Sequence, residues 1–156
     1  MIRFFDLQKI NQQYQEQFQK KMELVLDKGW FILGDEVRAF ESNFADYCGS
    51  GHCIGVGNGL DALVLIFKGY IQLGKLQKGD EVIGVAAGFP TTVNPILQFG
   101  AIPVFVDIDP QTHNIDVSKI EAAISPKTKA IMLAHSLGNP FNLDVVTALC
   151  KKYNLC

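Results

Sequence analysis

Apolar side chains recur at helical spacing through the first part of the chain. The positions that repeat every three or four residues are Leu7, Ile10, Tyr14, Phe18, Met22 and Leu26. This period predicts one amphipathic helix with a Gln- and Lys-rich outer face, which ends near Gly29. A second helix is predicted to begin at Gly34 and Asp35. Its apolar stripe is formed by Val37, Phe40, Phe44 and Tyr47.

From residue 52 onward, short apolar runs alternate with helical patterns. The predicted strands cover residues 52–56, 81–85, 102–108 and 129–135. The predicted helices cover residues 60–73, 90–99, 117–124 and 143–153, with Asp116 as the N-cap of the third. Strands that are apolar along their whole length are typical of parallel sheets that are buried on both faces. The expected fold class is therefore α/β, with a mostly parallel sheet and helices on both of its faces.

Composition narrows the function without choosing one. The chain has 156 residues, of which 48% are hydrophobic and 19% are charged, as in an ordinary globular domain with a real core. The net charge is −2 and no basic block is present, which argues against a nucleic-acid partner. The uncharged stretch 82–106 contains Pro90, Pro95 and Pro103, and a membrane-spanning helix is not expected to be interrupted so often. We therefore expect neither nucleic acid nor membrane as a partner.

The cysteines indicate the compartment more than the chemistry. Cys48, Cys53, Cys150 and Cys156 form no Cys-x-x-Cys pair, and no histidine lies at ligand spacing from them. No metal site is therefore expected. Scattered single thiols fit a reducing cytoplasm, and the N-terminus has no signal-peptide apolar region.

A small-residue turn carries the main candidate for ligand binding. The predicted strand 52–56 is followed by Gly57-Asn58-Gly59, and an apolar helix opens at Leu60. Free amides at a helix start, together with the helix dipole, favour an anion such as a phosphate. The spacing is neither a P-loop nor a complete Gly-x-Gly-x-x-Gly, because Ala62 stands where the third glycine would be. A purely structural turn is an equally good interpretation of these residues.

Ligands of parallel sheets bind at the carboxyl ends of the strands, so the residues after each strand are the next candidates. Phe89 is placed to stack on a planar ligand, with packing in the core as the alternative. His135 is a candidate hydrogen-bond donor or proton carrier, and Asn139 a candidate amide ligand, although both suit structural roles as well. Trp30 suits a substrate wall, a dimer contact or the core. We expect Glu41 to be solvated.

The remaining acidic candidates lie at the end of the third predicted strand and after it. Asp107, Asp109 and Asp116 are expected to shape turns and caps. The residues alone contain no nucleophile–base pair and no carboxylate dyad. They therefore indicate an α/β domain with a phosphate-binding turn and no catalytic group.

Taken in order, the motifs of the chain resemble the N-terminal part of the DegT/DnrJ/StrS family of PLP-dependent nucleotide-sugar enzymes. The resemblance covers essentially the whole chain, and its motifs are specific in combination although each is weak alone. They begin at Phe5, Gly29, Phe40, His52, Asn58, Gly79, Pro103 and Lys127 and read FDL, GWFILG, FE followed by FA, HCIGV, NGLDAL, GDEVI, PVFVD and KTKAI.

The subfamily signal is split. Residues 1–83 are similar to aminotransferases that act on dTDP-linked keto-sugars. Residues 85–156, with AAGFPTTVNP from Ala86 and HSLGNPFNLD from His135, resemble the CDP-4-keto-6-deoxyglucose 3-dehydrase branch. A divergent intermediate, a recombinant gene and a chimeric chain would each produce this split.

The resemblance implies a fold, a cofactor and site residues. The fold would be part of the large domain of the aspartate aminotransferase-like fold type I. The cofactor would be pyridoxal phosphate or pyridoxamine phosphate. The backbone of Asn58, Gly59 and Leu60 would hold the cofactor phosphate, Phe89 would stack on the pyridine ring, and the 135–139 loop would lie beside cofactor and sugar. The substrate would be a nucleotide-linked keto-deoxy sugar, as in deoxysugar, lipopolysaccharide and O-antigen biosynthesis, and the assembly a homodimer.

Several family groups lie beyond the positions that residues 1–156 match. They are the Asp that contacts the pyridine nitrogen, the Schiff-base Lys or the His that replaces it, and the cysteines of the dehydrase iron–sulfur cluster. The resemblance therefore implies N-terminal helices plus a partial PLP-binding large domain, without the small C-terminal domain. We expect this chain alone to carry out neither transamination nor dehydration. A non-catalytic remnant or a phosphate-binding module is the alternative.

The same resemblance makes the first predicted strand vulnerable. In this fold the strand 52–56 lies at the far side of the sheet from the next three strands, and the strands between them come from later sequence. We therefore expect it to lack neighbours for its backbone groups, which would leave the chain poorly stable or this strand paired elsewhere.

Overall fold

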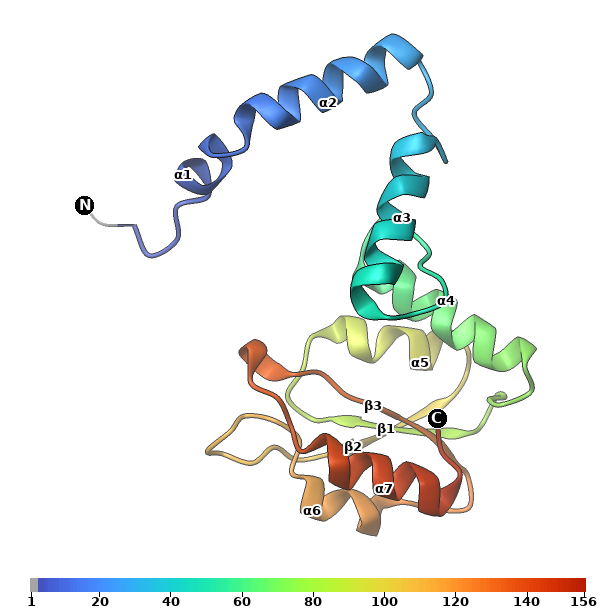
Figure 1. Ribbon diagram of the computed structural model, residues 1–156. Coiled ribbons are helices and arrows are strands. Elements are labelled where there is room, and N and C mark those ends of the chain that lie inside the picture. Colours follow the sequence, from blue (N-terminus) through green and yellow to red (C-terminus); the bar gives the residue numbers. More distant parts are fainter. Residues whose placement is uncertain (1–2) are drawn as a thin grey trace. The chain divides into compact units, whose positions relative to one another are not determined.

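The computed structural model describes residues 3–156, which form two compact units (Figure 1). The first unit is Met1–Gly55 and the second is Val56–Cys156.

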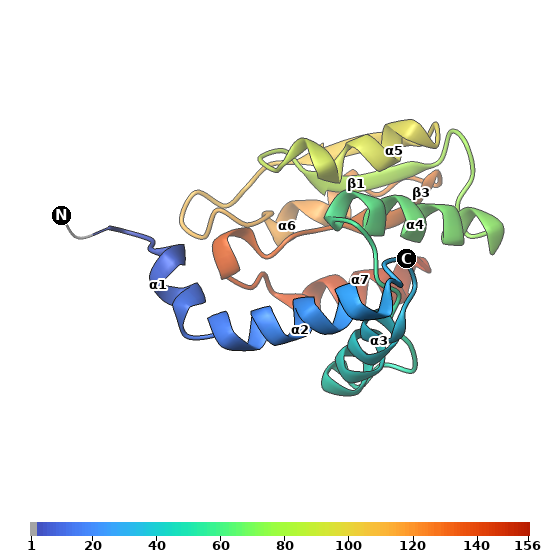
Figure 2. The ribbon, with the colours of Figure 1, turned by 90° about the horizontal axis from the view of Figure 1, so that it is seen from above.

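The first unit is helical. Its helices are α1 (Leu7–Gln12), α2 (Gln15–Lys28) and α3 (Asp35–Cys48). One continuous helix was expected where α1 and α2 stand, and this was wrong, because the chain turns at Gln13 and Tyr14 (Figure 2). The amides of these two residues donate to carbonyls only three positions back, which tightens the last turn of α1. The predicted end at Gly29 is confirmed, since Gly29 has the left-handed φ of 61° that suits glycine at a helix end.

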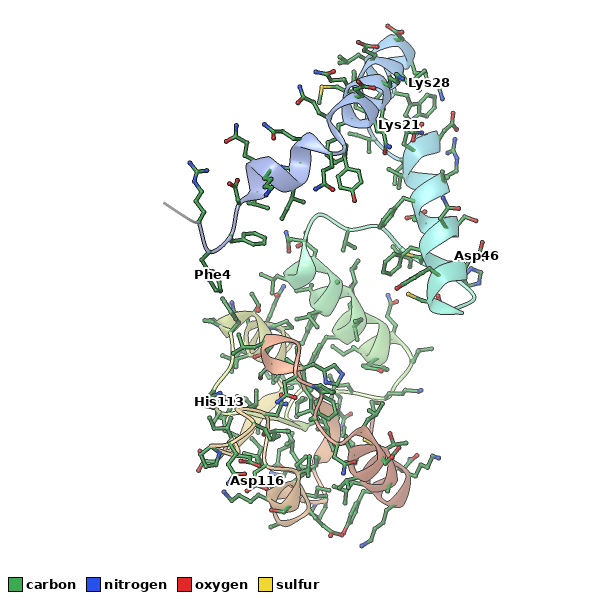
Figure 3. The ribbon with its side chains drawn as sticks, turned by 60° about the vertical axis from the view of Figure 1, so that its left-hand side comes forward. Phe4, Lys21, Lys28, Asp46, His113 and Asp116 are labelled. Atoms are coloured by element: carbon green, nitrogen blue, oxygen red, sulfur yellow. The ribbon has the colours of Figure 1, made fainter. Side chains whose placement is uncertain are left out.

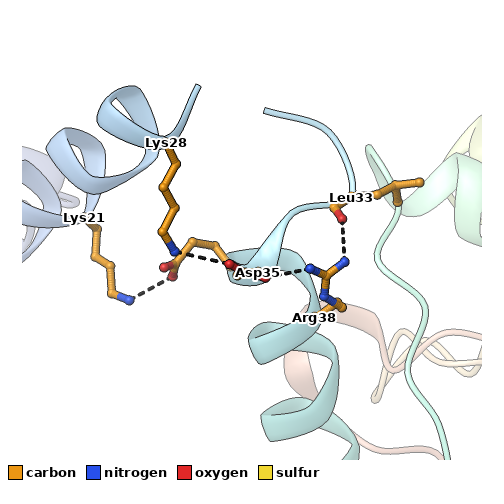
Figure 4. Close-up of polar contacts among 6 residues, drawn as sticks. Lys21, Lys28, Leu33, Asp35 and Arg38 are labelled. Carbon is orange, nitrogen blue, oxygen red and sulfur yellow. Dashed lines mark hydrogen bonds and ion pairs between the residues drawn. The ribbon is translucent and has the colours of Figure 1, made fainter. Parts of the chain in front are cut away.

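Charged side chains connect α2 and α3 (Figure 4). The Lys21 ammonium lies 2.8 Å from the Glu36 carboxylate, and the Lys28 ammonium lies 3.2 Å from Asp35. Asp35 also accepts a 2.6 Å hydrogen bond from Arg38, which is the main reason that the pKa of this carboxyl lies below its usual value. These groups are exposed, so each pair contributes little to stability. Within α1–α3 the buried residue is Ala45, and the large apolar side chains of these helices are mostly exposed.

The second unit is built on a parallel sheet. Its strands are β1 (Glu81–Val85), β2 (Ile102–Val106) and β3 (Thr128–Met132), in the spatial order β2-β1-β3. In register, Ile83 of β1 lies opposite Val104 of β2 and Ile131 of β3. The α/β class and the parallel sheet predicted from the apolar strands are thereby confirmed.

Helices cover both faces of this sheet (Figure 1). On one face, α4 (Gly59–Gln72) and α5 (Asn94–Gln98) pack Phe67 and Ile96 against Val82 of β1. On the other face, α6 (Val117–Ile120) and α7 (Leu143–Tyr153) pack against the next residue of the same strand, Ile83. Neighbouring residues of a strand point to opposite faces, so an all-apolar strand serves two cores at once. Short 3₁₀ turns complete the unit: η1 (Pro90–Thr92), η2 (Glu121–Ala123) and η3 (Ser136–Gly138).

The predicted strand 52–56 was wrong. This segment forms no strand in the described structure, because none of the three described strands pairs with it. The Gly55 amide instead donates a 2.7 Å hydrogen bond to the Glu41 carboxylate. Glu41, expected to be solvated, is therefore half-buried and satisfies a backbone group that a sheet would otherwise satisfy.

Several other boundaries differ from the predictions. The predicted helix 90–99 is divided into η1 and α5. The predicted strand 102–108 ends at Val106, although Ile108 forms an isolated antiparallel bridge with Ile115. The predicted helix 117–124 passes into the 3₁₀ turn η2 after Ile120, and the strand predicted at 129–135 is β3. The predicted limits of β1 and α7 are confirmed.

Candidate functional site

The start of α4 is a capped helix end with free amides. Asn58 is the N-cap: its Oδ1 accepts the Asp61 amide at 3.0 Å, and its Nδ2 donates to the Asp61 carboxylate at 3.0 Å. In the described part of the chain, the amides of Gly59 and Leu60 have no hydrogen-bond acceptor. Unpaired amides at the positive end of a helix dipole favour an anion. The cap explains why Asn stands at position 58. Phosphate binding by this turn stays a prediction.

The glycines on either side of Asn58 have different surroundings. A Cβ on Gly57 would lie 3.1 Å from the Asp61 Oδ2, so Gly57 makes room for that carboxylate. A Cβ on Gly59 would meet nothing within 4 Å. The space over Gly59 is open, which lets a ligand oxygen reach the backbone closely.

A cavity of about 690 Å³ lies at the carboxyl ends of β1 and β3, which are neighbours in the sheet. Phe89, from the loop after β1, and His135, from the loop after β3, both line it. The Phe89 side chain is 80% exposed, so the alternative that it packs in the core is wrong. The ring is held at the start of η1, where the Phe89 carbonyl accepts from the amide and the hydroxyl of Thr92. An exposed aromatic face in a largely apolar cavity is suited to a planar ligand.

His135 has a defined orientation. Its Nδ1 accepts the Phe141 amide at 3.3 Å, and its ring stacks on the Phe141 ring with 4.3 Å between centroids. Because Nδ1 is an acceptor here, the neutral imidazole carries its proton on Nε2. His135 is therefore fixed as a hydrogen-bond donor through Nε2.

Asn139 contributes to the structure of the loop and does not line this cavity. Its Nδ2 donates to the Thr112 carbonyl at 3.2 Å, and its own carbonyl accepts from the Nδ2 of Asn114 at 2.8 Å. Asn114 was not among the residues proposed from the sequence. It is buried and it joins the loop after β2 to the loop after β3. No local pattern marks it, because its partners are more than twenty positions away.

Trp30 lies in the first unit. Its Nε1 donates to the Ile32 carbonyl at 2.6 Å, and its ring borders a cavity together with Phe31 and Val37. The side chain is exposed, so the core alternative for Trp30 is wrong. Its proposed contact with a substrate stays a prediction.

Asp116, which is labelled in Figure 3, and Asp109 act as the predicted cap and turn residues. Asp116 caps α6 through the Ser118 amide. The Ser118 hydroxyl, and then Lys119, hold the pKa of the Asp116 carboxyl below its usual value. Asp109 accepts the Gln111 amide at 2.7 Å, and the Asp107 carbonyl accepts the Asp116 amide.

Among residues 3–156, no group of three or more His, Cys, Asp or Glu residues is arranged to hold a metal ion, and nothing supports an iron–sulfur cluster. All four cysteines are free thiols. None of the described helices combines the length and the apolarity that a membrane crossing requires.

Comparison with known proteins adds an independent line of evidence. Residues 12–156 match the DegT/DnrJ/EryC1/StrS aminotransferase family. The chain is 46% identical over 155 residues to a dTDP-3-amino-3,6-dideoxy-alpha-D-galactopyranose transaminase of Aneurinibacillus thermoaerophilus, covering 99% of this chain and 42% of that protein. It is 49% identical over 144 residues to the lipopolysaccharide biosynthesis protein RfbH of Salmonella typhimurium, covering 90% of this chain and 33% of the relative.

The fold of this chain is also similar to that of a solved dehydratase structure. The E. coli GDP-4-keto-6-deoxy-D-mannose-3-dehydratase with bound hydrated PLP has a TM-score of 0.82 and 35% identity, covering 87% of this chain and 36% of that one. The chain thus spans less than half of the length of each protein named here, and it resembles transaminases and dehydratases alike. From the match over residues 12–156 and the shared fold, the chain belongs to the DegT/DnrJ/EryC1/StrS aminotransferase family.

Proposed function

We propose that this chain forms the phosphate-binding and ring-stacking side of a PLP or PMP site in an enzyme of nucleotide-sugar biosynthesis. The observation that carries the proposal is the exposed ring of Phe89, which faces an apolar cavity at the carboxyl ends of two adjacent parallel strands, with His135 on the same cavity. That is where ligands of open parallel sheets bind.

The described residues fit such a cofactor. The open amides of Gly59 and Leu60 would hold its phosphate, and Phe89 would cover one face of its pyridine ring. The Nε2–H of His135 offers a hydrogen bond to a ligand oxygen. The bound cofactor would act as an electron sink for chemistry at the sugar carbon. No lysine is among the residues that line this cavity, so the contacts proposed here are non-covalent and would serve PLP and PMP alike.

The chemical role of each residue follows from its surroundings. The helix dipole and the free amides at the start of α4 stabilise a phosphate dianion without a lysine or arginine. The Phe89 ring excludes water from the face that it covers, which strengthens the polar contacts made at the rim. His135 keeps its proton on Nε2 as long as the Phe141 amide occupies Nδ1.

Aminotransferase and 3-dehydratase chemistry both remain within the proposal, since relatives of both kinds match. The proposed substrate is a nucleotide-linked keto-deoxy sugar, and the proposed assembly is a cytoplasmic homodimer in which residues 1–156 are N-terminal helices plus part of the large domain. The 156-residue chain alone is proposed to carry out neither reaction. For transamination the physical reason is that no residue of the described cavity offers an amine nucleophile. A phosphate-binding module is the second candidate, favoured by the open amides at α4.

Isothermal titration of the purified chain with PMP, inorganic phosphate and pyridoxamine tests the proposal. The expected result is a higher affinity for PMP than for either inorganic phosphate or pyridoxamine. Phe89→Leu should weaken PMP binding and leave phosphate binding unchanged. Phe105→Leu is the matched control. Phe105 is also an exposed phenylalanine of this unit, but it lies on β2, outside the cavity.

The outcomes separate the two candidates. Equal binding of PMP and phosphate, insensitive to Phe89, would leave the phosphate-binding module and remove the cofactor site. No binding of any of the three ligands would remove both. Turnover of an amino donor by the pure chain would contradict the proposal that it is inactive alone.

A further inference from the structure

The turn that carries the cavity residues after β3 has an unfavourable backbone. Leu137 has a φ of 54° and Gly138 a φ of 79°. The left-handed region suits glycine, whereas it is unfavourable for other L-residues, because their Cβ lies too close to the following carbonyl oxygen. The Leu137 side chain is 97% exposed, so its own packing does not offset that cost. Such a conformation persists only where the surrounding structure over-determines it.

Asn114 supplies that constraint. Its side chain is 2% exposed, and it bonds to both ends of the turn. Its Oδ1 accepts the Ser136 amide at 2.9 Å, and its Nδ2 donates to the Asn139 carbonyl at 2.8 Å. Asn114 is itself held by its backbone, since its carbonyl accepts the Asp109 amide and its amide donates to the Thr112 hydroxyl.

We propose that Asn114 is a positioning residue of the candidate site, which holds the Ser136–Gly138 turn so that His135 and Leu137 border the same cavity as Phe89. Asn114 does not line the cavity itself and acts through the turn, whose Ser136 does. The consequence for a ligand rests on the proposed function, whereas the effect on the turn does not.

The chemistry of the side chain explains why an asparagine is required. The turn presents one donor, the Ser136 amide, and one acceptor, the Asn139 carbonyl, to the same buried point. A primary amide satisfies both at once. Aspartate has no donor for the carbonyl, alanine and leucine satisfy neither group, and a buried unsatisfied polar group is costly.

Amide hydrogen exchange tests the effect on the turn. In Asn114→Ala, the Ser136 amide should exchange at least about tenfold faster relative to the amides of Val82 and Ile83, which report the core of the sheet. The matched control is Asn142→Ala. Asn142 caps α7 through the Val145 amide. Like Asn114, it borders a cavity that Thr112 and Phe141 also line, separate from that of Phe89, but it has no bond to the turn. The control should leave Ser136 protection unchanged.

Ligand binding separates positioning from a merely structural role. Asn114→Ala should weaken PMP binding at least fivefold and leave inorganic phosphate binding within twofold, because the amides of α4 do not depend on the turn. Equal losses for both ligands, or unchanged PMP affinity in a variant whose Ser136 amide has lost protection, would overturn the positioning role.

If the unmodified chain binds no PMP, the cofactor site is rejected, and two measurements on Asn114→Ala decide the inference. One is the exchange rate of the Ser136 amide. The other is the NMR signal of the His135 ring, which stacks on Phe141 and should change its chemical shift in this variant. If that variant does not fold, the unmodified chain decides: the Asn114 Nδ2 protons should be strongly protected, and exchange at the rate of a free amide would refute the clamp.

Discussion

Replacing Gly59 by alanine should separate the stability of α4 from its affinity for an anion. Gly59 is the first residue of the helix, its φ is not positive, and an added Cβ would meet no heavy atom within 4 Å. Gly→Ala at a compatible position stabilises the fold by about 0.4–1 kcal/mol, because the unfolded chain loses conformational freedom. For a chain of this length, that corresponds to an increase in Tm of roughly 1–4 °C.

The same methyl group should weaken binding, because it occupies the open space through which a phosphate oxygen approaches the amides. A hydrogen bond to a charged group contributes about 1.5–3 kcal/mol. Loss of one such bond raises the Kd roughly 10- to 150-fold. The expected result for Gly59→Ala is therefore a more stable protein that binds PMP and inorganic phosphate more weakly.

The measurements are calorimetric unfolding without ligand and isothermal titration with both ligands. Gly69→Ala is the matched control, since Gly69 lies inside the same helix and a Cβ there also meets nothing within 4 Å. It should raise stability by about 1 kcal/mol without any change in affinity. If Gly59→Ala lowers Tm, or if its affinity loss equals that of the Gly69 control, the reasoning about an open anion site at α4 is refuted.

The remaining predictions concern charge and packing in the second unit. Asp61→Asn should preserve the Asn58 cap and strengthen phosphate binding about fivefold, because it removes about 1 kcal/mol of repulsion at the helix start; titration at low and high salt checks this, and a salt-independent or absent gain would contradict it. Ile83→Ala should lower the free energy of unfolding in urea by about 2–5 kcal/mol, because the Ile83 side chain is fully buried between the sheet and the α6–α7 layer. A loss below about 1 kcal/mol would mean that this core does not hold the fold. The hydrogen bond from Lys152, and then that from Tyr153, lower the pKa of the Glu121 carboxyl in the folded chain. The interaction therefore stabilises the fold at a pH above the unfolded-state pKa, and this stabilisation is lost as the pH falls through the lower, folded-state pKa. The Tm difference between the unmodified chain and Glu121→Gln should accordingly shrink as the pH drops below 4.5, and a difference that stays constant down to pH 2 would disprove it.

The elements that were predictable are those that local pattern defines. The limits of β1 and α7 follow from an apolar run between polar turns and from an apolar period after a capping asparagine, Asn142. The predicted cap at Asp116 and the helix end at Gly29 follow from side chains that bond to their own neighbours in sequence. Each of these signals is decided within a few residues, so the sequence contains it in full.

The strand predicted at 52–56 shows where this reasoning stops. Its residues have the right composition, but a strand exists only through a partner, and the described residues provide none. The Gly55 amide instead bonds to Glu41, fourteen positions earlier, a contact that no local pattern predicts.

The candidate site divides in the same way. The sequence by itself determined the parallel α/β class, the turn at Gly57–Gly59 and the positions of Phe89 and His135 after strands. The alternation of apolar runs with helical patterns, and the chemistry of turn residues, are both local signals. Only the tertiary structure decided that Phe89 is exposed rather than buried, and that Asn114 clamps the turn beside His135. Exposure and long-range hydrogen bonds depend on which segments the fold brings together, and that information lies in the packing of the whole unit rather than in any stretch of it.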